Sequence, residues 1–480
     1  MTAHKLDTYP KSTLDHGDAT YALVKRADGK KALSISGESA GFIGKRAGDR
    51  LICPLTPENA RSLRERLAWL RPQPLGLETS FGFGDRLGLA TPGHAQAASG
   101  YEAIAPIFAQ QSVRENARTG RTPQEVMDDA TWALFQVGWR RAWGADADHL
   151  KTTEAIDAFI KAGYTLYTID PGDHVDDAAH TASPADVKAR VAALPWETLE
   201  TTQGDLETRY LNEAIDVEEA ALTFDRETLY RAAAKYGRAI AYTATLYRHL
   251  AARLGADAFE LEVSVDETET PTSPEEHVYI ASELKRLGVA WVSLAPRYIG
   301  RFEKGVDYIG DLDVFRKELE SHAAIARALG PYKLSIHSGS DKFSIYPIIA
   351  ELTEGLVHVK TAGTSYLEAL RAIAQVEPEF FRQILSLARQ QYETDRATYH
   401  VSGTLNKVPP ANAPDDAELP DLLDQFDARQ VLHVTFGSVL DRYGDRLLET
   451  LRANDALYAE VLAHHLQRHL APLSQFTRRI

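Results

Sequence analysis

The sequence predicts a (β/α)8, or TIM, barrel with a small N-terminal β-rich extension and two long helical insertions at the catalytic face. Three observations lead to this fold class. Short apolar runs typical of buried strands alternate with amphipathic helical patterns, as in a parallel sheet with right-handed crossovers. Polar residues gather where many of these runs end. A chain of 480 residues, 44% of them hydrophobic, is long enough to bury the core of such a barrel.

Residues 1–55 are predicted to form the β-rich extension, and residues 56–480 the barrel domain. Two alternating runs within residues 21–36 surround Asp28-Gly29, a dipeptide that favours a tight hairpin turn. A capping threonine, a proline and an apolar stripe then predict a helix over residues 56–69.

Eight runs are predicted to be the barrel strands. In chain order they are residues 74–80, 145–152, 164–170, 258–265, 289–295, the start of 332–347, 356–361 and 431–436. Two connections are much longer than a barrel needs, and they are predicted to be insertions at residues 171–257 and 362–429. Long connections after barrel strands fall at the catalytic face, where they often form lids.

A glycine-rich segment, residues 82–88, is predicted to be a loop that wraps a small substrate. Asp85, Arg86 and His94 are its candidate contact residues. The segment is one residue too long for the dinucleotide-binding fingerprint, and no neighbouring βαβ unit supplies a ribose-binding acid. We therefore expect no nicotinamide cofactor.

Charge and cysteine usage restrict the partners. A net charge of -15 disfavours nucleic acid and anionic membrane surfaces, although a local cationic pocket for a small acid is compatible with it. The single cysteine, Cys53, excludes an internal disulfide and fits a reducing compartment. We see no signal-peptide core and no apolar run of membrane-spanning length. A cytoplasmic location is therefore expected, and a homo-oligomer is compatible with the sequence.

Histidines and carboxylates occupy the predicted strand ends on the side that faces the barrel interior. They are His149 with Asp148 and Lys151, then Asp170, Glu260, Glu262, Asp266, His337, His358 with Lys360, and His433. Imidazole and carboxylate ligands together suit a divalent ion such as zinc, manganese or nickel. Lys151, Arg297, Lys342 and Lys360 would give this mouth the positive charge that an anionic substrate needs. His465 and His469, four residues apart on a C-terminal helix, are interpreted instead as a solvated pair.

Six blocks of the sequence, in this order, resemble the tagaturonate/fructuronate epimerase family. They are GFGDRLGLATPGH, GADADHLKT, VSVDETETPTSP, FEKGVDYIGD, SIHSGSDKFSIYP and LHVTFGSVL, and they extend over most of the chain. The resemblance implies a cytoplasmic, metal-dependent isomerase of hexuronate catabolism that interconverts D-tagaturonate and D-fructuronate. For some members of such families it also implies activity on fructose and tagatose.

The chemistry of this reaction favours a bond-breaking route. The two acids differ at C4, whose hydrogen is not acidified by the ketone, so enolisation cannot invert this carbon. In a retro-aldol route a base removes the hydroxyl proton, a carbon–carbon bond breaks, and a divalent ion stabilises the enediolate. The aldehyde then turns over and the bond reforms on its other face.

From these arguments we predict that His149, His337 and His358 bind the metal, that Asp148 is the base, and that Asp266 or Glu267 is the opposing acid. A rival ligand set is Asp170, Glu262 and His337. The substrate contacts are predicted to come from Lys151, Asp170, Arg297, Ser338, Asp341 and Lys342. Two alternative functions remain open: another metal-dependent sugar or sugar-acid isomerase or an aldolase on the same barrel, and a noncatalytic sugar-acid binding protein.

Overall fold

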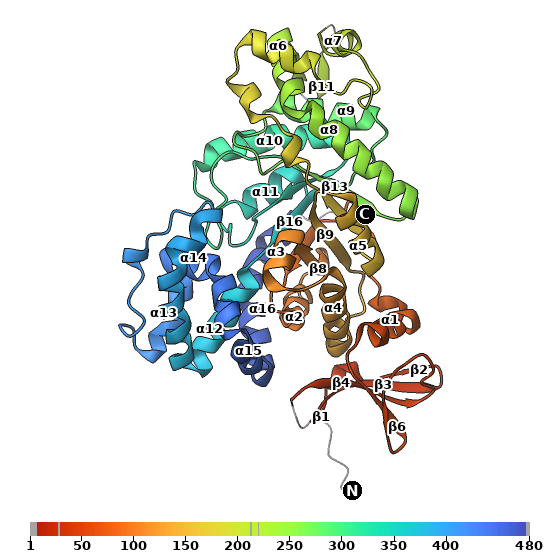
Figure 1. Cartoon of the computed structure of the whole chain (residues 1–480), viewed down its shortest axis with the longest axis vertical. Coiled ribbons are helices and arrows are strands. Elements are labelled where there is room, and N and C mark those ends of the chain that lie inside the picture. Colours follow the sequence, from red (N-terminus) through yellow and green to blue (C-terminus); the bar gives the residue numbers. More distant parts are fainter. Residues whose placement is uncertain (1–6, 27–28, 212–213, 219, 477–480) are drawn as a thin grey trace.

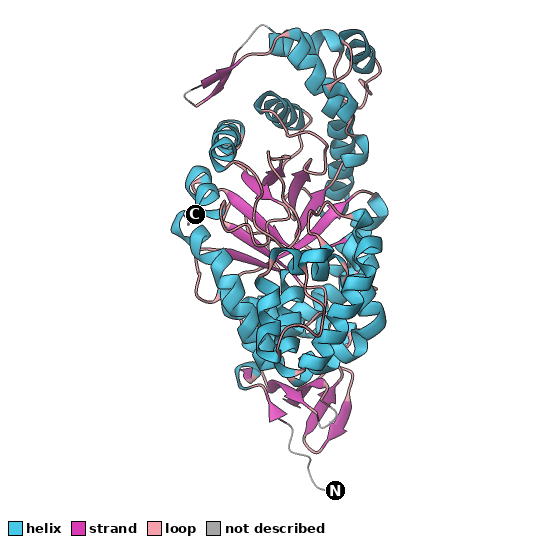
Figure 2. Ribbon diagram, turned by 90° about the vertical axis from the view of Figure 1, so that its left-hand side faces the viewer, coloured by secondary structure: helices cyan, strands magenta, loops and turns pink. Residues whose placement is uncertain are grey.

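The protein is a closed eight-stranded barrel with a separate N-terminal sheet, as seen in a computed structural model that describes residues 7–26, 29–211, 214–218 and 220–476. Figure 1 shows the N-terminal sheet at the lower end, the barrel in the middle and two helical regions beyond it. In Figure 2 the barrel strands lie together in the centre and helices enclose them. The predicted fold class is confirmed.

The N-terminal sheet is antiparallel and contains the predicted hairpin. Its strands are β1 (Asp7–Thr8), β2 (Leu14–His16), β3 (Ala19–Lys25), β4 (Lys31–Gly37), β5 (Lys45–Ala47) and β6 (Arg50–Cys53). Lys25 of β3 pairs with Lys31 of β4, which confirms the hairpin, while Asp28 at its turn lies outside the described residues. The predicted helix follows as α1 (Pro57–Arg66), because the Thr56 hydroxyl accepts a hydrogen bond from the Asn59 amide at its start.

The barrel is formed by parallel strands in chain order, and the last strand, β16, pairs with the first, β7, to close it. The strands are β7 (Ser80–Gly84), β8 (Ala105–Ser112), β9 (Gly144–Leu150), β10 (Leu166–Ile169), β13 (Glu260–Ser264), β14 (Ser293–Ala295), β15 (Lys333–Ile336) and β16 (Val357–Thr361). Every residue of these strands except His149 is buried, as expected for strands covered by helices on the outside and by packed side chains inside.

The first predicted strand was misplaced. Of residues 74–80 only Ser80 belongs to the first strand, and the strand continues to Gly84, into the glycine-rich segment that was predicted to be a loop. A Cβ at Gly82 would lie 1.6 Å from Gln110 Oε1, and one at Gly84 would lie 2.5 Å from the Thr361 carbonyl oxygen. These glycines therefore allow the neighbouring strands to approach, which is a use of glycine inside strands.

The last predicted strand is also wrong. Residues 431–436 belong to α14 (Phe426–Val434) and the start of α15 (Phe436–Ala453), and the strand that completes the barrel is β8, which the sequence analysis missed. A short apolar run that is buried on all sides has no periodicity that distinguishes a strand from a helix.

The barrel strands are connected mainly by helices that cover its outside. These are α2 (Thr91–Ala98), α3 (Val113–Thr119), α4 (Pro123–Val137), α5 (Thr153–Ala162), α9 (Pro274–Arg286), α10 (Leu312–Leu329) and α11 (Tyr346–Thr353). In the part of the chain that is described, no helix combines the length and the apolar character needed to cross a bilayer.

The first long insertion follows the C-terminal end of β10, as predicted. It contains α6 (Pro184–Ala192), α7 (Gln203–Leu211), the two-stranded ribbon of β11 (Ile215–Val217) and β12 (Ala220–Leu222), and α8 (Arg226–Leu254). Figure 2 shows the ribbon projecting at the upper end.

The second predicted insertion is a C-terminal helical extension, because β16 before it is already the last barrel strand. Its helices are α12 (Thr364–Val376), α13 (Pro378–Asp395), α14, α15 and α16 (Asp455–Leu473). Figure 1 shows most of this extension beside the barrel.

Candidate active site

The side chains of His149, Asp266 and His337 converge at the C-terminal mouth of the barrel. His149 lies near the end of β9, Asp266 lies just beyond β13, and His337 directly follows β15. Asp266 Oδ1 lies 3.2 Å from His337 Nδ1 and 3.8 Å from His149 Nε2. One ligand atom of each residue lies within 4.8 Å of the others, so the three residues form a candidate metal site.

A local irregularity turns two neighbouring residues toward this mouth. In a regular strand Asp148 and His149 would point to opposite faces. The pairing of β9 with β10 shifts between Ala147 and Leu150, and His149 has a φ of 55°. This bulge lets both side chains line the same pocket.

Each histidine of the cluster is oriented by a carboxylate at its other nitrogen. His149 Nδ1 lies 2.8 Å from Asp148 Oδ1, and His337 Nε2 lies 2.7 Å from Glu262 Oε1. A carboxylate accepts hydrogen bonds, so these nitrogens carry the protons, and the opposite nitrogens are turned toward Asp266. Among the described residues, His337 Nδ1 is buried without a well-aligned hydrogen bond. Histidines that bind a metal usually donate the N–H of their other ring nitrogen to a carboxylate in this way.

Lys360 fixes the carboxylates beneath the cluster. Its Nζ lies 2.8 Å from oxygens of Asp146, Asp148 and Glu262. Although burial opposes it, these three charges hold the pKa of Lys360 well above its ordinary value. Burial likewise raises the pKa of Glu262, but Lys360 and His337 lower it more and keep the carboxyl well below its usual range. Lys360 and Glu262 are therefore both charged at neutral pH.

His358 does not fit the predicted ligand set. Its Nδ1 lies 3.0 Å from the Ser80 hydroxyl oxygen, inside the barrel, and burial lowers its pKa to about 3. The cluster contains Asp266 in its place. The three residues of the rival ligand set do not form one site either. Glu262 bonds to His337 Nε2, the nitrogen that points away from Asp266, and Asp170 accepts a hydrogen bond from the Gly172 amide.

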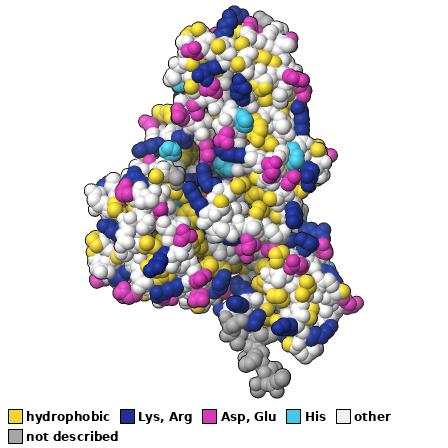
Figure 3. All heavy atoms as spheres, in the orientation of Figure 1, with side chains coloured by type: hydrophobic (Ala, Val, Ile, Leu, Met, Phe, Trp, Pro, Cys, Tyr) yellow, Lys and Arg dark blue, Asp and Glu magenta, His cyan; other side chains and the backbone are white. Residues whose placement is uncertain are grey.

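The cluster lines a cavity of about 60 Å³ whose wall is rich in charged side chains. Asp148, Glu267 and Ser338, which the sequence analysis selected, lie in this wall. Residues that it did not assign to the mouth also contribute, among them Gln110, Arg114, Arg118, Lys304 and Tyr399. Figure 3 shows basic, acidic and histidine side chains close together midway along this face of the molecule.

Lys151 and Arg297, two predicted substrate contacts, lie outside this cavity. Lys151 Nζ lies 2.8 Å from Asp173 and 3.6 Å from Asp170, so it forms an ion pair at the rim. Burial raises the pKa of Glu318 on α10 to about 7, and the positive charge of Arg297 opposes this shift.

Asp341 and Lys342, also predicted as substrate contacts, are buried supports of the loop after β15. Lys342 Nζ donates to the carbonyl oxygens of Glu303, Val306 and Ser340 at 2.8, 2.6 and 2.9 Å, and burial lowers its pKa to about 7. Asp341 pairs with Arg429 at 2.8 Å. Both side chains therefore use their polar atoms for bonds within the protein and not for substrate contacts.

The interpretation of His465 and His469 as a solvated pair is wrong, because both are buried. His465 Nε2 lies 2.6 Å from Asp341 Oδ1, and His469 Nε2 accepts a hydrogen bond from the Asp341 amide at 2.9 Å. Their spacing suits a metal ion, but Arg429 and these hydrogen bonds already use the atoms that would bind it. The group instead ties α16 to the loop after β15.

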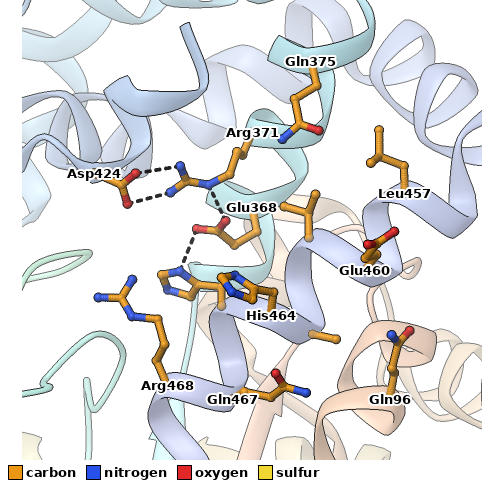
Figure 4. Close-up of a pocket in the computed structure, with 13 residues that line it drawn as sticks. Gln96, Glu368, Arg371, Gln375, Asp424, Leu457, Glu460, His464, Gln467 and Arg468 are labelled. Atoms are coloured by element: carbon orange, nitrogen blue, oxygen red, sulfur yellow. Dashed lines mark hydrogen bonds and ion pairs between the residues drawn. The ribbon is translucent and has the colours of Figure 1, made fainter. Parts of the chain in front are cut away.

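A larger cavity, of about 650 Å³, lies between α2, α12 and α16. Figure 4 shows Arg371 between Glu368 and Asp424, with bonds of 2.7 Å to the first and 2.9 and 3.0 Å to the second. Arg371 is therefore held between two carboxylates and is not free to bind an anionic ligand.

Weak sequence signals existed for the missed residues. Gln110 lies in β8, and the Ser112 hydroxyl at the end of that strand accepts from the Glu115 amide and caps α3. A capping serine after an apolar run indicates a strand-to-helix junction. Tyr399 is a different case, because it reaches the mouth only through the folding of the C-terminal extension.

Comparisons with known proteins show the family of this chain. A profile of a family described as tagaturonate epimerase matches residues 9–473. The chain is 43% identical over 473 residues to the tagaturonate/fructuronate epimerase of Thermotoga maritima, covering 97% of this chain and 96% of that protein. The native crystal structure of fructuronate-tagaturonate epimerase UxaE from Cohnella laeviribosi superposes with a TM-score of 0.93 at 38% identity, covering 100% and 98%. The crystal structure of the same enzyme with one glycerol superposes with a TM-score of 0.93 at 38% identity, covering 99% of this chain and 97% of that chain.

Proposed function

The chain belongs to the tagaturonate epimerase family, and we propose that it is an isomerase that interconverts D-tagaturonate and D-fructuronate by inverting C4. The observation that carries this proposal is the cluster of His149, Asp266 and His337 at the barrel mouth. We further propose that the enzyme acts in the cytoplasm on hexuronate-derived acids, which agrees with its single buried cysteine.

The cluster fits a divalent cation. Two imidazole nitrogens and one carboxylate oxygen suit zinc, manganese or nickel, and the carboxylates behind both histidines are the outer supports such a site needs. Although burial lowers it, Asp266 and Glu262 raise the pKa of His337 to about 9, so the site attracts positive charge. When bound, the ion would polarise the ketone and stabilise the negative charge that develops on the substrate.

The proposed reaction is a retro-aldol cleavage followed by an aldol addition. A base takes the proton of the C4 hydroxyl, the C3–C4 bond breaks, and its electron pair moves toward the ketone to form an enediolate. C4 becomes an aldehyde and rotates. The C3–C4 bond then reforms on the other face, and an acid protonates the new C4 oxygen. No oxidation occurs, so the route needs no hydride carrier.

Asp148 and Glu267 are the proposed proton-transfer groups. Both hydrogen bonds of Asp148, from His149 and Lys360, go to Oδ1, and 13% of its side chain remains exposed in the cavity wall. Glu267 lines the same cavity and pairs with Arg114 at 3.0 Å. Asp266, the other acid considered from the sequence, is assigned to the metal because it faces both histidines.

The test is an NMR assay of D-tagaturonate with protein that has been stripped by a chelator and then supplied with single divalent ions. We expect fructuronate only after an ion is added, and loss of this activity in Asp266→Asn. Glu269→Gln, an exposed carboxylate three residues further on, is the matched control and is expected to remain active.

Each other outcome has a definite meaning. Turnover by stripped protein would refute the metal-dependent route. Accumulation of the two fragments without the epimer would show an aldolase on the same barrel, and no conversion with any ion would refute the epimerase proposal.

A further inference from the structure

Four cationic side chains line the cavity away from the metal cluster, and most of them already have partners. Arg114 pairs with Glu267 at 3.0 Å, and Arg118 donates to the Tyr399 hydroxyl. These contacts leave two other cations, Lys304 and Arg86, to be explained.

Lys304 is a half-buried cation without a carboxylate partner. Its Nζ donates to the Ser338 hydroxyl at 2.7 Å, and Lys304 forms no ion pair with a carboxylate of the described residues. Burial lowers the pKa of Lys304, with Glu115 opposing the shift at longer range. Removing an ammonium group even partly from water is unfavourable without a counter-charge, so a Lys304 ammonium group at the cavity wall favours an anionic ligand there.

Arg86 also lines this cavity, and one of its guanidinium nitrogens has no hydrogen-bond partner among the described residues. Its Nε and Nη2 donate to Glu115 Oε1 at 2.9 and 2.6 Å, and its guanidinium carbon lies 3.8 Å from the centre of the Phe436 ring. Arg86 is 3% exposed, and Nη1 is buried without a hydrogen-bond partner among the described residues. Glu115 and Phe436 therefore fix the guanidinium and leave one donor for another acceptor.

We propose that Lys304 and Arg86 bind the C6 carboxylate of the ketose acid and thereby select the acid over the neutral ketohexose. This inference rests on the proposed function. The carboxylate and the ketone are at opposite ends of the substrate. Lys304 and Arg86 bond to Ser338 and Glu115 and not to the three residues of the metal cluster. Ser338 connects both ends, because its hydroxyl accepts from Lys304 and its neighbour is His337.

The same contact has a role in the reaction. After the C3–C4 bond breaks, the carboxylate belongs to the C4–C6 aldehyde fragment. A fragment held at C6 can rotate about its C4–C5 bond and present its other face without leaving. Loss of the anchor is therefore expected to release fragments as well as to weaken binding.

The test uses Lys304→Met, with Lys304→Arg as the charge-conserving variant and Lys317→Met, an exposed lysine on α10, as the control. In Lys304→Met we expect the KM for tagaturonate to rise about 10- to 100-fold, as for loss of a hydrogen bond to a charged group. We also expect free aldehyde fragment by NMR. Lys304→Arg should recover part of the affinity, and the control should match the wild type.

Calorimetry with D-galactonate and galactitol separates this inference from the proposed function. Galactonate affinity should fall in Lys304→Met while galactitol affinity does not change, and this comparison holds even if the wild-type protein proves not to be an epimerase. Equal losses for the acid and the polyol, or no loss for either, would overturn the assignment of the carboxylate site. An unchanged melting temperature excludes misfolding as the cause, and Arg86→Gln repeats the comparison at the second cation.

Discussion

Replacing Asp148 with asparagine is expected to weaken metal binding, because Asp148 orients a ligand of the proposed ion. Its Oδ1 accepts hydrogen bonds from His149 Nδ1 and Lys360 Nζ, both at 2.8 Å. Asparagine keeps the size and one acceptor oxygen but loses the charge. Loss of a carboxylate that supports a ligating histidine lowers metal affinity about 10- to 100-fold. This corresponds to about 1.4 to 2.8 kcal/mol.

The same substitution should slow the reaction when the metal is saturating. Loss of a proton-transfer group lowers the rate by about 10²- to 10⁴-fold. The fold is expected to survive, because Lys360 keeps Asp146 and Glu262 at 2.8 Å each. The two effects can therefore be measured separately in one variant.

Metal titration by calorimetry gives the first effect, and turnover of tagaturonate at saturating metal gives the second. Asp441→Asn, an exposed aspartate on α15, is the control for loss of a single negative charge. Full recovery of kcat at saturating metal would refute the proton-transfer role of Asp148. Unchanged metal affinity would refute the argument that it orients His149.

Three further predictions address the residues around the site. His358→Gln is expected to leave metal affinity unchanged in a calorimetric titration, whereas Asp266→Asn should lower it at least about tenfold. Arg429→Met removes the guanidinium partner of the buried Asp341 Oδ2 and leaves His465 at Oδ1, and urea unfolding should show a loss of about 3 to 5 kcal/mol that Asp341→Asn partly restores. Burial lowers the pKa of His322 to about 4, so the folded state disfavours its protonation and stability falls as pH drops below about 6.5. The loss attributable to His322 between pH 6.5 and 5 is about 2 kcal/mol, and urea unfolding of His322→Asn should show a correspondingly weaker pH dependence.

Much of the barrel was predictable because its strands repeat one physical pattern. Strands such as β9, β13 and β16 are apolar on the side that meets helices, and they alternate with helices of clear period. The pattern fails where backbone approach decides the residue, as at Gly82 and Gly84 of β7. The pattern also fails in α14, because a helix that is buried on all sides has no polar face to reveal its period.

The site shows a similar division. Side-chain parity correctly directs His337 and His358 toward the barrel interior. In β9 the interior positions are Asp146 and Asp148, and His149 reaches the mouth only because of the bulge. Side-chain parity does not show how far along the barrel axis, from its N-terminal end toward the C-terminal mouth, an inward-facing residue lies. His358 is the second residue of β16 and lies low, whereas Lys360, two residues further along, reaches the carboxylates beneath the cluster. Asp266 lies beyond the end of its strand, where alternation no longer fixes its direction.

The C-terminal extension has a structural role that local sequence patterns cannot reveal. Ser338 and Asp341, in the loop that begins with His337, have φ angles of 50° and 60°. Such conformations cost about 1 to 3 kcal/mol each for residues other than glycine. Arg429 of α14 and His469 of α16 bond to Asp341 and hold the loop in this shape. Helices that follow the last barrel strand therefore stabilise the strained loop that carries one of the proposed metal ligands.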